Sequence, residues 1–201
     1  MIEFTETHLK LSQAVCKALI AFASSDKTRA DINGVGINQG NVCATDGHGI
    51  VRFQKHIGVP NAVDNRVFSL EYVKQQLKIA AAQKSDTVEL DNATLVRTLS
   101  FPPVHHAETN NRKIHLPAAT PYAFNAELFG RMALVQAACS PTKRNKPSDG
   151  TWQPAKLVSL SHPKQPCTFE VGSHSTPHPS VHFARVTLMP VDLNWPTGQD
   201  E

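Results

Sequence analysis

The sequence lacks a long apolar run, a signal-like start and a closely spaced cysteine pair. No uncharged apolar stretch approaches the ~20 residues that span a bilayer, and Glu3 and Glu6 stand where a signal peptide carries positive charge. The four cysteines include no CxxC pair, which indicates a reduced compartment. We therefore expect a cytoplasmic protein with no membrane partner.

The chain also lacks a strong excess of either positive or negative charge. The chain has 20 lysines and arginines against 17 aspartates and glutamates, far from the balance of a protein that grips nucleic acid by charge alone. Any DNA contact should therefore be local and weak. With 201 residues, of which 40% are hydrophobic, the chain can bury one good core or two modest ones.

Two short runs near the start of the chain carry most of the information, and each contains a turn. Residues 29–35 include a turn-prone Asn-Gly pair that leads into the alternating apolar residues of a strand. Residues 44–50 contain an Asp-Gly pair, which predicts another turn with His48 at a surface corner. Together the runs predict a meander of short antiparallel strands over residues 34–57.

Three segments share one plan of strand, cap and helix. The first helix is predicted over residues 7–23, where apolar residues recur at helical spacing after a short strand at residues 2–4. In each segment a phenylalanine precedes a residue whose side-chain oxygen can cap a helix, and a nearby glutamate suits the helix dipole. These pairs are Phe4-Thr5, Phe68-Ser69 and Phe124-Asn125.

Predicted strands follow each helix, so a β-α-β-β unit is expected to repeat along the chain. They lie at residues 34–57, 87–90, 94–99, 157–160, 168–171 and 181–188. The predicted class is α+β, with helices on one face of antiparallel sheets. Residues 103–121 are rich in Pro, Asn and His, which predicts a boundary between a first domain at 1–110 and a reduced domain at 111–201.

Four separated motifs stand in a distinctive order along the chain. They are the runs at 28–35 and 44–48, the Phe101-Pro102 pair and the closing stretch at 188–193. In this order they resemble the bacterial sliding clamp, the beta subunit of the replicative DNA polymerase. The resemblance covers most of residues 1–110 and then the C-terminal part of the family's last domain. It implies the DNA clamp fold in a shortened clamp, such as a phage or mobile element could encode.

In that family, these motifs line a hydrophobic pocket that receives a short peptide from polymerases and other clients. The resemblance implies a client-peptide pocket built from Ile32, Thr45, Gly47, His48, Ile50, Pro102, Thr187, Leu188, Met189, Pro190, Val191 and Leu193. Aliphatic side chains and a methionine suit this task, because they form an adaptable apolar floor. The sequence departs from the family at Gly49, where arginine is usual, and at Asp192, where a basic residue is common.

The family also has a channel whose helices turn basic side chains toward double-stranded DNA. The resemblance carries this role to Lys10, Lys17, Lys74, Lys78 and Arg131. We predict that the first two lysines share a helical face, as do the next two. Loose phosphate contacts suffice for a ring, since topology supplies retention. Ordinary solvated lysines are the alternative interpretation.

The leading hypothesis is a sliding clamp that tethers a DNA polymerase, or other proteins with a clamp-binding motif, to DNA. It implies no catalysis and no cofactor, a homo-oligomer that closes a ring, and a clamp loader as a further partner. The alternative is a module that keeps the pocket without encircling DNA, and modulates or competes for a polymerase. These hypotheses share the peptide pocket and differ in DNA retention.

A third hypothesis assigns catalysis or metal binding to the Asp-Gly turn. Asp46 could orient His48 as a general base, or both could join His105 and His106 in a metal site. Turn formation explains the Asp-Gly pair more simply, and no third ligand has helical or CxxC spacing. We therefore predict no catalytic or metal-binding residue.

Overall fold

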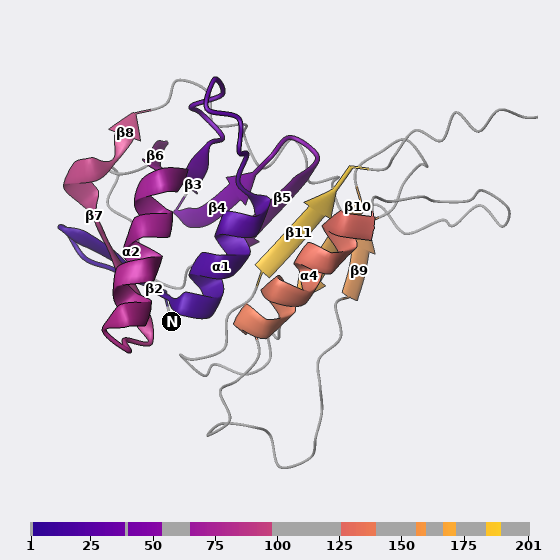
Figure 1. The fold of residues 1–201 in the computed structure, drawn as a ribbon. Coiled ribbons are helices and arrows are strands. Elements are labelled where there is room, and N and C mark those ends of the chain that lie inside the picture. The colour runs from indigo at the N-terminus through magenta and orange to yellow at the C-terminus, as the bar shows by residue number, and fades with distance from the viewer. Residues whose placement is uncertain are drawn as a thin grey trace, which may run out of the picture.

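Helices pack on one side of antiparallel strands, so the predicted α+β class is confirmed (Figure 1). The structure, a computed structural model, describes residues 2–38, 40–53, 65–97, 126–139, 156–159, 167–171 and 184–189. None of the helices among these residues is long and apolar enough to cross a membrane.

The strands within the described residues form two antiparallel sheets. The larger contains β3 (Gly34–Asn38), β4 (Asn41–Thr45), β5 (Gly49–Phe53), β6 (Arg66–Ser69), β8 (Val96–Arg97), β9 (Lys156–Ser159), β10 (Cys167–Val171) and β11 (Ala184–Leu188). Their spatial order is β8-β6-β3-β4-β5-β11-β10-β9. The smaller sheet contains β1 (Ile2–Phe4), β2 (His8–Ser12) and β7 (Thr87–Asp91), in the order β1-β2-β7.

The predicted meander is confirmed by β3, β4 and β5, which pair in sequence order. The predicted strand at 94–99 is only partly correct, because a 3-10 turn occupies Asn92–Thr94 and β8 begins at Val96. The remainder of that segment and residues 54–57 lie outside the described residues.

The first helix is shorter than predicted, because the start of the predicted segment is a strand. In β2 the side chains of Leu9 and Leu11 are buried, while their neighbours are half-buried. This two-residue alternation suits a strand that pairs with β1 on one side and β7 on the other. Helix α1 covers only Gln13–Phe22. The prediction that Lys10 and Lys17 share a helical face is therefore wrong, since Lys10 belongs to β2.

The predicted helix caps had different outcomes. Ser12 caps α1 by accepting a hydrogen bond from an amide of the first turn, so the predicted cap at Thr5 is wrong. The Thr5 hydroxyl instead forms a local turn with His8. Ser69 caps α2 (Leu70–Ala82) as predicted. The predicted cap at Asn125 lies outside the described residues, next to α4 (Ala126–Cys139).

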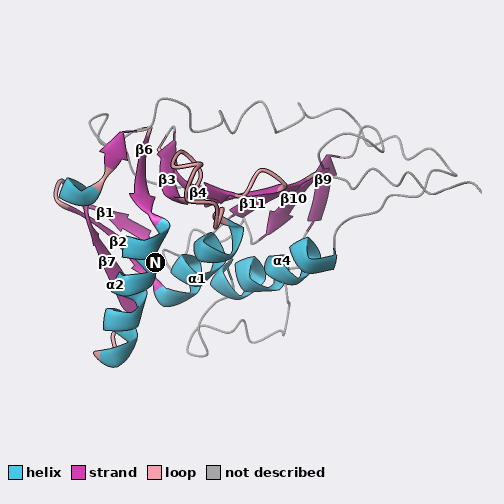
Figure 2. Ribbon diagram, turned by 45° about the horizontal axis from the view of Figure 1, so that its top comes forward, coloured by secondary structure: helices cyan, strands magenta, loops and turns pink. Residues whose placement is uncertain are grey.

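Helix α1 is central in the helical layer, because it packs against both α2 and α4 (Figure 2). Its inner face buries Val15, Leu19 and Phe22 in the main hydrophobic core. All four cysteines are buried and free. Burial raises the pKa of the thiols of Cys16, Cys139 and Cys167 to about 12, so these groups stay protonated at neutral pH.

The larger sheet and the main core both combine residues from the two predicted domains. Strand β11 pairs with β5, and the core includes Phe22 and Val51 together with Val135 and Val186. The predicted boundary at 103–121 lies outside the described residues, so the division into two domains stays a prediction.

Candidate functional site

The candidate site centres on a tight turn between β4 and β5. Gly47 has a φ of +93°, a left-handed conformation that glycine adopts without a steric penalty. The Asp46 carboxylate closes the turn, because its Oδ1 accepts hydrogen bonds from the amides of His48 (2.8 Å) and Gly49 (2.9 Å). The Thr45 hydroxyl accepts another from the Gly47 amide (3.1 Å). This bonding leaves His48 exposed at the corner.

Residues from the C-terminal part of the described chain lie directly against this turn. Strand β11 pairs with β5 in a register that places Leu188 opposite Gly49. Just beyond the strand, the Met189 amide donates a hydrogen bond of 2.8 Å to the His48 carbonyl oxygen. The structure thus brings together two of the motifs that the sequence analysis assigned to one site.

The loop between α1 and β3 also contacts the turn region. The Ser24 amide donates hydrogen bonds of 3.1 Å to the carbonyl oxygens of both Ile32 and Thr45. The side-chain amide of Asn33 donates to the Ser24 carbonyl oxygen at 2.7 Å. These bonds fix the first sequence run beside the end of β4.

The predicted pocket residues differ in how accessible they are. The buried members are Ile32, Thr45, Thr187 and Leu188. The accessible members are Gly47, His48, the half-buried Ile50, and Met189, which is 40% exposed. The remaining members, which lie outside the described residues, are Pro102, Pro190, Val191 and Leu193. A ligand at this surface would therefore meet the accessible members first.

The site includes residues from both faces of the larger sheet. Ile50 and Thr187 are paired across β5 and β11 and lie on the face turned away from the helices. Leu188 belongs to the main core instead. A Cβ added at Gly49 would lie 3.1 Å from the Phe22 ring and 3.3 Å from Leu188. Any side chain at this position, such as the arginine that the resemblance would lead us to expect, requires those neighbours to move.

An ion pair that no sequence motif predicts connects the turn to helix α4. Nη1 of Arg131 donates to Oδ2 of Asp46, and Nη2 donates to Glu127 at 2.8 Å. The guanidinium carbon also lies 6.0 Å from the centroid of the Phe22 ring, within cation-π range. The resemblance predicts a DNA contact for Arg131, whereas two of its nitrogens face carboxylates in the structure. Because Asp46 lies 85 positions away in the chain, no local spacing could indicate this pair.

The same contacts set the protonation of Asp46. Burial disfavours the ionised carboxylate, but hydrogen bonds from Arg131 and from the Gly49 and His48 amides outweigh that effect. The pKa of Asp46 is therefore lowered from its ordinary value. The carboxylate is ionised at neutral pH and can accept all three bonds.

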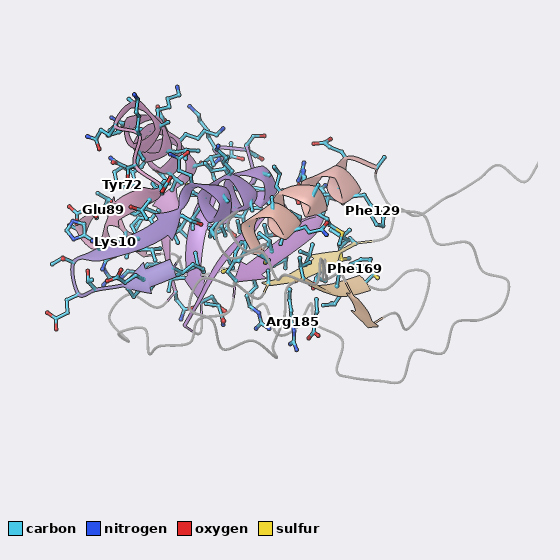
Figure 3. The ribbon with its side chains drawn as sticks, turned by 90° about the horizontal axis from the view of Figure 1, so that it is seen from below. Lys10, Tyr72, Glu89, Phe129, Phe169 and Arg185 are labelled. Atoms are coloured by element: carbon cyan, nitrogen blue, oxygen red, sulfur yellow. The ribbon has the colours of Figure 1, made fainter. Side chains whose placement is uncertain are left out.

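The lysines for which the resemblance predicts DNA contacts lie in two different settings. Lys10 on β2 forms an ion pair of 3.0 Å with Glu89 on β7 (Figure 3), and this contact raises the pKa of Lys10. Lys17 on α1, and Lys74 and Lys78 on α2, are exposed. The exposed three project from helices whose opposite faces are buried.

The histidine and carboxylate of the turn do not extend into a metal site within the described residues. No group of three or more His, Cys, Asp or Glu side chains there could hold a metal ion. His105 and His106 lie outside the described residues. The described geometry around Asp46 is that of a hydrogen-bonded turn.

We expect Gly47→Ala to lower the free energy of unfolding by about 1–2 kcal/mol, because an L-residue is strained in the left-handed conformation. Its Cβ would also lie 3.3 Å from a guanidinium nitrogen of Arg29. Gly130→Ala is the control, since nothing lies within 4 Å of a Cβ at this helical position. It should stabilise the protein by roughly 0.5–1 kcal/mol. Urea unfolding measures the free energy of unfolding of both variants. Equal changes in the two would contradict the left-handed conformation assigned to residue 47.

We also expect the turn to be sensitive to acid. Because the folded-state pKa of Asp46 is lowered, its stabilisation is complete above the unfolded pKa of about 4 and is lost as the pH falls through the folded value. The free energy of unfolding, measured between pH 7 and pH 2, should fall less steeply for Asp46→Asn than for wild type. Parallel profiles for Asp46→Asn and wild type would refute the expectation.

No protein-family model matches this sequence, and no curated protein matches it. The structure is similar to that of the DnaN sliding clamp (DNA polymerase III subunit beta) from Bartonella birtlesii, with 14% identity and a TM-score of 0.47 over 95% of this chain and 67% of that one. The DNA polymerase III beta subunit from Thermotoga maritima has 12% identity and a TM-score of 0.46 over 96% and 67%. A DNA polymerase sliding clamp from Pseudomonas aeruginosa has 12% identity and a TM-score of 0.45 over 95% and 68%. All three TM-scores are below 0.5, and all three sequence identities are 14% or lower.

Proposed function

We propose that this protein is a sliding-clamp-like processivity factor, which tethers a DNA polymerase or another client to double-stranded DNA. The junction of the Asp46–His48 turn with Met189 is the observation that supports the proposal most directly. It joins two separated motifs of the sequence resemblance at one surface. Tethering requires binding alone, so no catalytic group is assigned.

The client side of the proposal is a peptide-binding pocket at this junction. Met189 and Ile50 offer partly accessible apolar side chains, and a methionine adapts its shape to the anchor that it meets. The exposed His48 ring and the backbone of the turn can exchange hydrogen bonds with a peptide. A short segment with a leucine or phenylalanine anchor is the ligand class that fits these groups.

For DNA binding, we assign loose phosphate contacts to Lys17 on α1 and to Lys74 and Lys78 on α2. Each neutralised phosphate would steepen the salt dependence of binding by about 0.9 in log-log slope. Lys10 and Arg131 fit this role less well, because acidic side chains already face them. Retention on DNA then depends on a closed homo-oligomeric ring, which implies a clamp loader as a further partner.

A second candidate function is a binding module that keeps the pocket without encircling DNA. Helix α4 favours it, because two of its large apolar side chains, Phe129 and Leu134, are 44% and 41% exposed. Phe129 also packs edge-on against Phe169 of β10, with centroids 6.0 Å apart (Figure 3). A helix that lines a DNA channel should instead expose basic residues. Such a module would modulate or compete for a polymerase.

We expect Met189→Ala to weaken binding of a clamp-binding peptide by roughly tenfold, since truncating an apolar anchor removes about 1–3 kcal/mol of burial. Ile79→Ala is a matched control, because Ile79 on α2 is also 40% exposed but lies away from the turn. Isothermal titration calorimetry with one peptide measures both. If the peptide fails to bind wild type, both candidate functions are rejected.

Retention on circular DNA separates the two candidates. A clamp should remain on a circular duplex and leave it after linearisation, and light scattering should give an oligomeric mass. Lys17→Gln combined with Lys74→Gln and Lys78→Gln should reduce the salt slope of binding, by at most about 2.7 for three lost phosphate contacts. A protein that is monomeric at all concentrations and never retained would contradict the clamp and favour the non-encircling module.

A further inference from the structure

The two oxygens of the Asp46 carboxylate accept hydrogen bonds from two different parts of the molecule. Oδ1 accepts hydrogen bonds from the amides of His48 and Gly49, which belong to the turn itself. Oδ2 accepts a hydrogen bond from Nη1 of Arg131, which belongs to helix α4. Because a carboxylate is planar, holding one oxygen from α4 also fixes where the other oxygen points. The orientation of α4 is thereby linked to the hydrogen bonds that shape the turn.

The setting of Arg131 makes this link stronger than an ordinary surface ion pair. The side chains of Arg131 and Asp46 are 21% and 15% exposed, so water screens the pair only partly. Glu127, one helical turn earlier on α4, holds a second guanidinium nitrogen. Phe22 lies within cation-π range of the guanidinium. Three groups thus hold the planar guanidinium in one orientation.

We propose that Arg131 is a positioning residue, which holds the turn at residues 46–49 in the conformation that receives a client peptide. The inference rests on the proposed function for its peptide, and it assigns Arg131 a role other than DNA contact. Peptide affinity then depends on how α4 is docked, although Arg131 need not touch the peptide. A lysine could not fully replace it, because an ammonium is a strongly hydrated point charge that lacks the planar guanidinium held between Asp46 and the Phe22 ring.

Amide hydrogen exchange, followed by NMR, tests the positioning directly. In Arg131→Gln, exchange at the His48 and Gly49 amides should accelerate by at least about tenfold, since a hydrogen bond to a charged group contributes about 1.5–3 kcal/mol. The Val51 amide of β5 should exchange as in wild type. If the substitution instead lowered the stability of the whole fold, exchange at the Val51 amide would accelerate as well. Arg131→Lys should recover only part of the protection.

Glu127→Gln provides the matched control. It removes the other carboxylate partner of Arg131 and leaves the pair with Asp46 in place. Its turn amides should exchange within about twofold of wild type. The client peptide should bind Arg131→Gln at least about tenfold more weakly than wild type, and Glu127→Gln almost as tightly as wild type.

Each outcome decides one part of the proposal. Unchanged exchange at His48 and Gly49 in Arg131→Gln would overturn the positioning role, whether or not the peptide binds. Faster exchange at these amides with unchanged peptide affinity would overturn its effect on the peptide. If wild type binds no peptide, the proposed function fails, while the exchange result still decides whether Arg131 positions the turn. If Arg131→Gln does not fold, Arg131→Lys serves for the same comparisons.

Discussion

Antiparallel pairing between β5 and β11 joins the N-terminal and C-terminal parts of the described chain. Five residue pairs, from Gly49 opposite Leu188 to Phe53 opposite Ala184, form this contact. Because side chains alternate between the faces of a sheet, the register also decides which side chains enter the core. It turns Val51 and Val186 inward and leaves Ile50 and Thr187 on the other face. A shift of one residue would reverse this assignment.

The turn at Asp46 lies where that pairing ends, and it is held from two directions. Met189 holds its backbone through the His48 carbonyl, and Arg131 holds its carboxylate. Both residues come from the part of the chain that follows residue 125. The N-terminal strands alone therefore do not provide the geometry of the candidate site.

Charge is distributed unevenly over the helical layer. Lys17, Lys74 and Lys78 are exposed on α1 and α2, whereas the charged residues of α4 pair with each other and with Asp46. Helix α4 also carries two partly exposed apolar side chains, Phe129 and Leu134. The first two helices suit the proposed clamp, and the third suits the non-encircling module. The two functions therefore differ in which part of this layer meets the partner.

Features that depend on neighbouring residues can be predicted from the sequence alone. The meander of β3, β4 and β5, the Ser69 cap and the exposed corner at His48 follow from alternation and turn chemistry within a few positions. Features that depend on distant partners arise only when the chain folds. Residues 8–12 fit both a helix and a strand, and pairing with β7 made them a strand. Arg131 meets Asp46 across 85 positions. Local patterns do not encode such contacts, because they form only when β5 and β11 pair and α4 packs on α1.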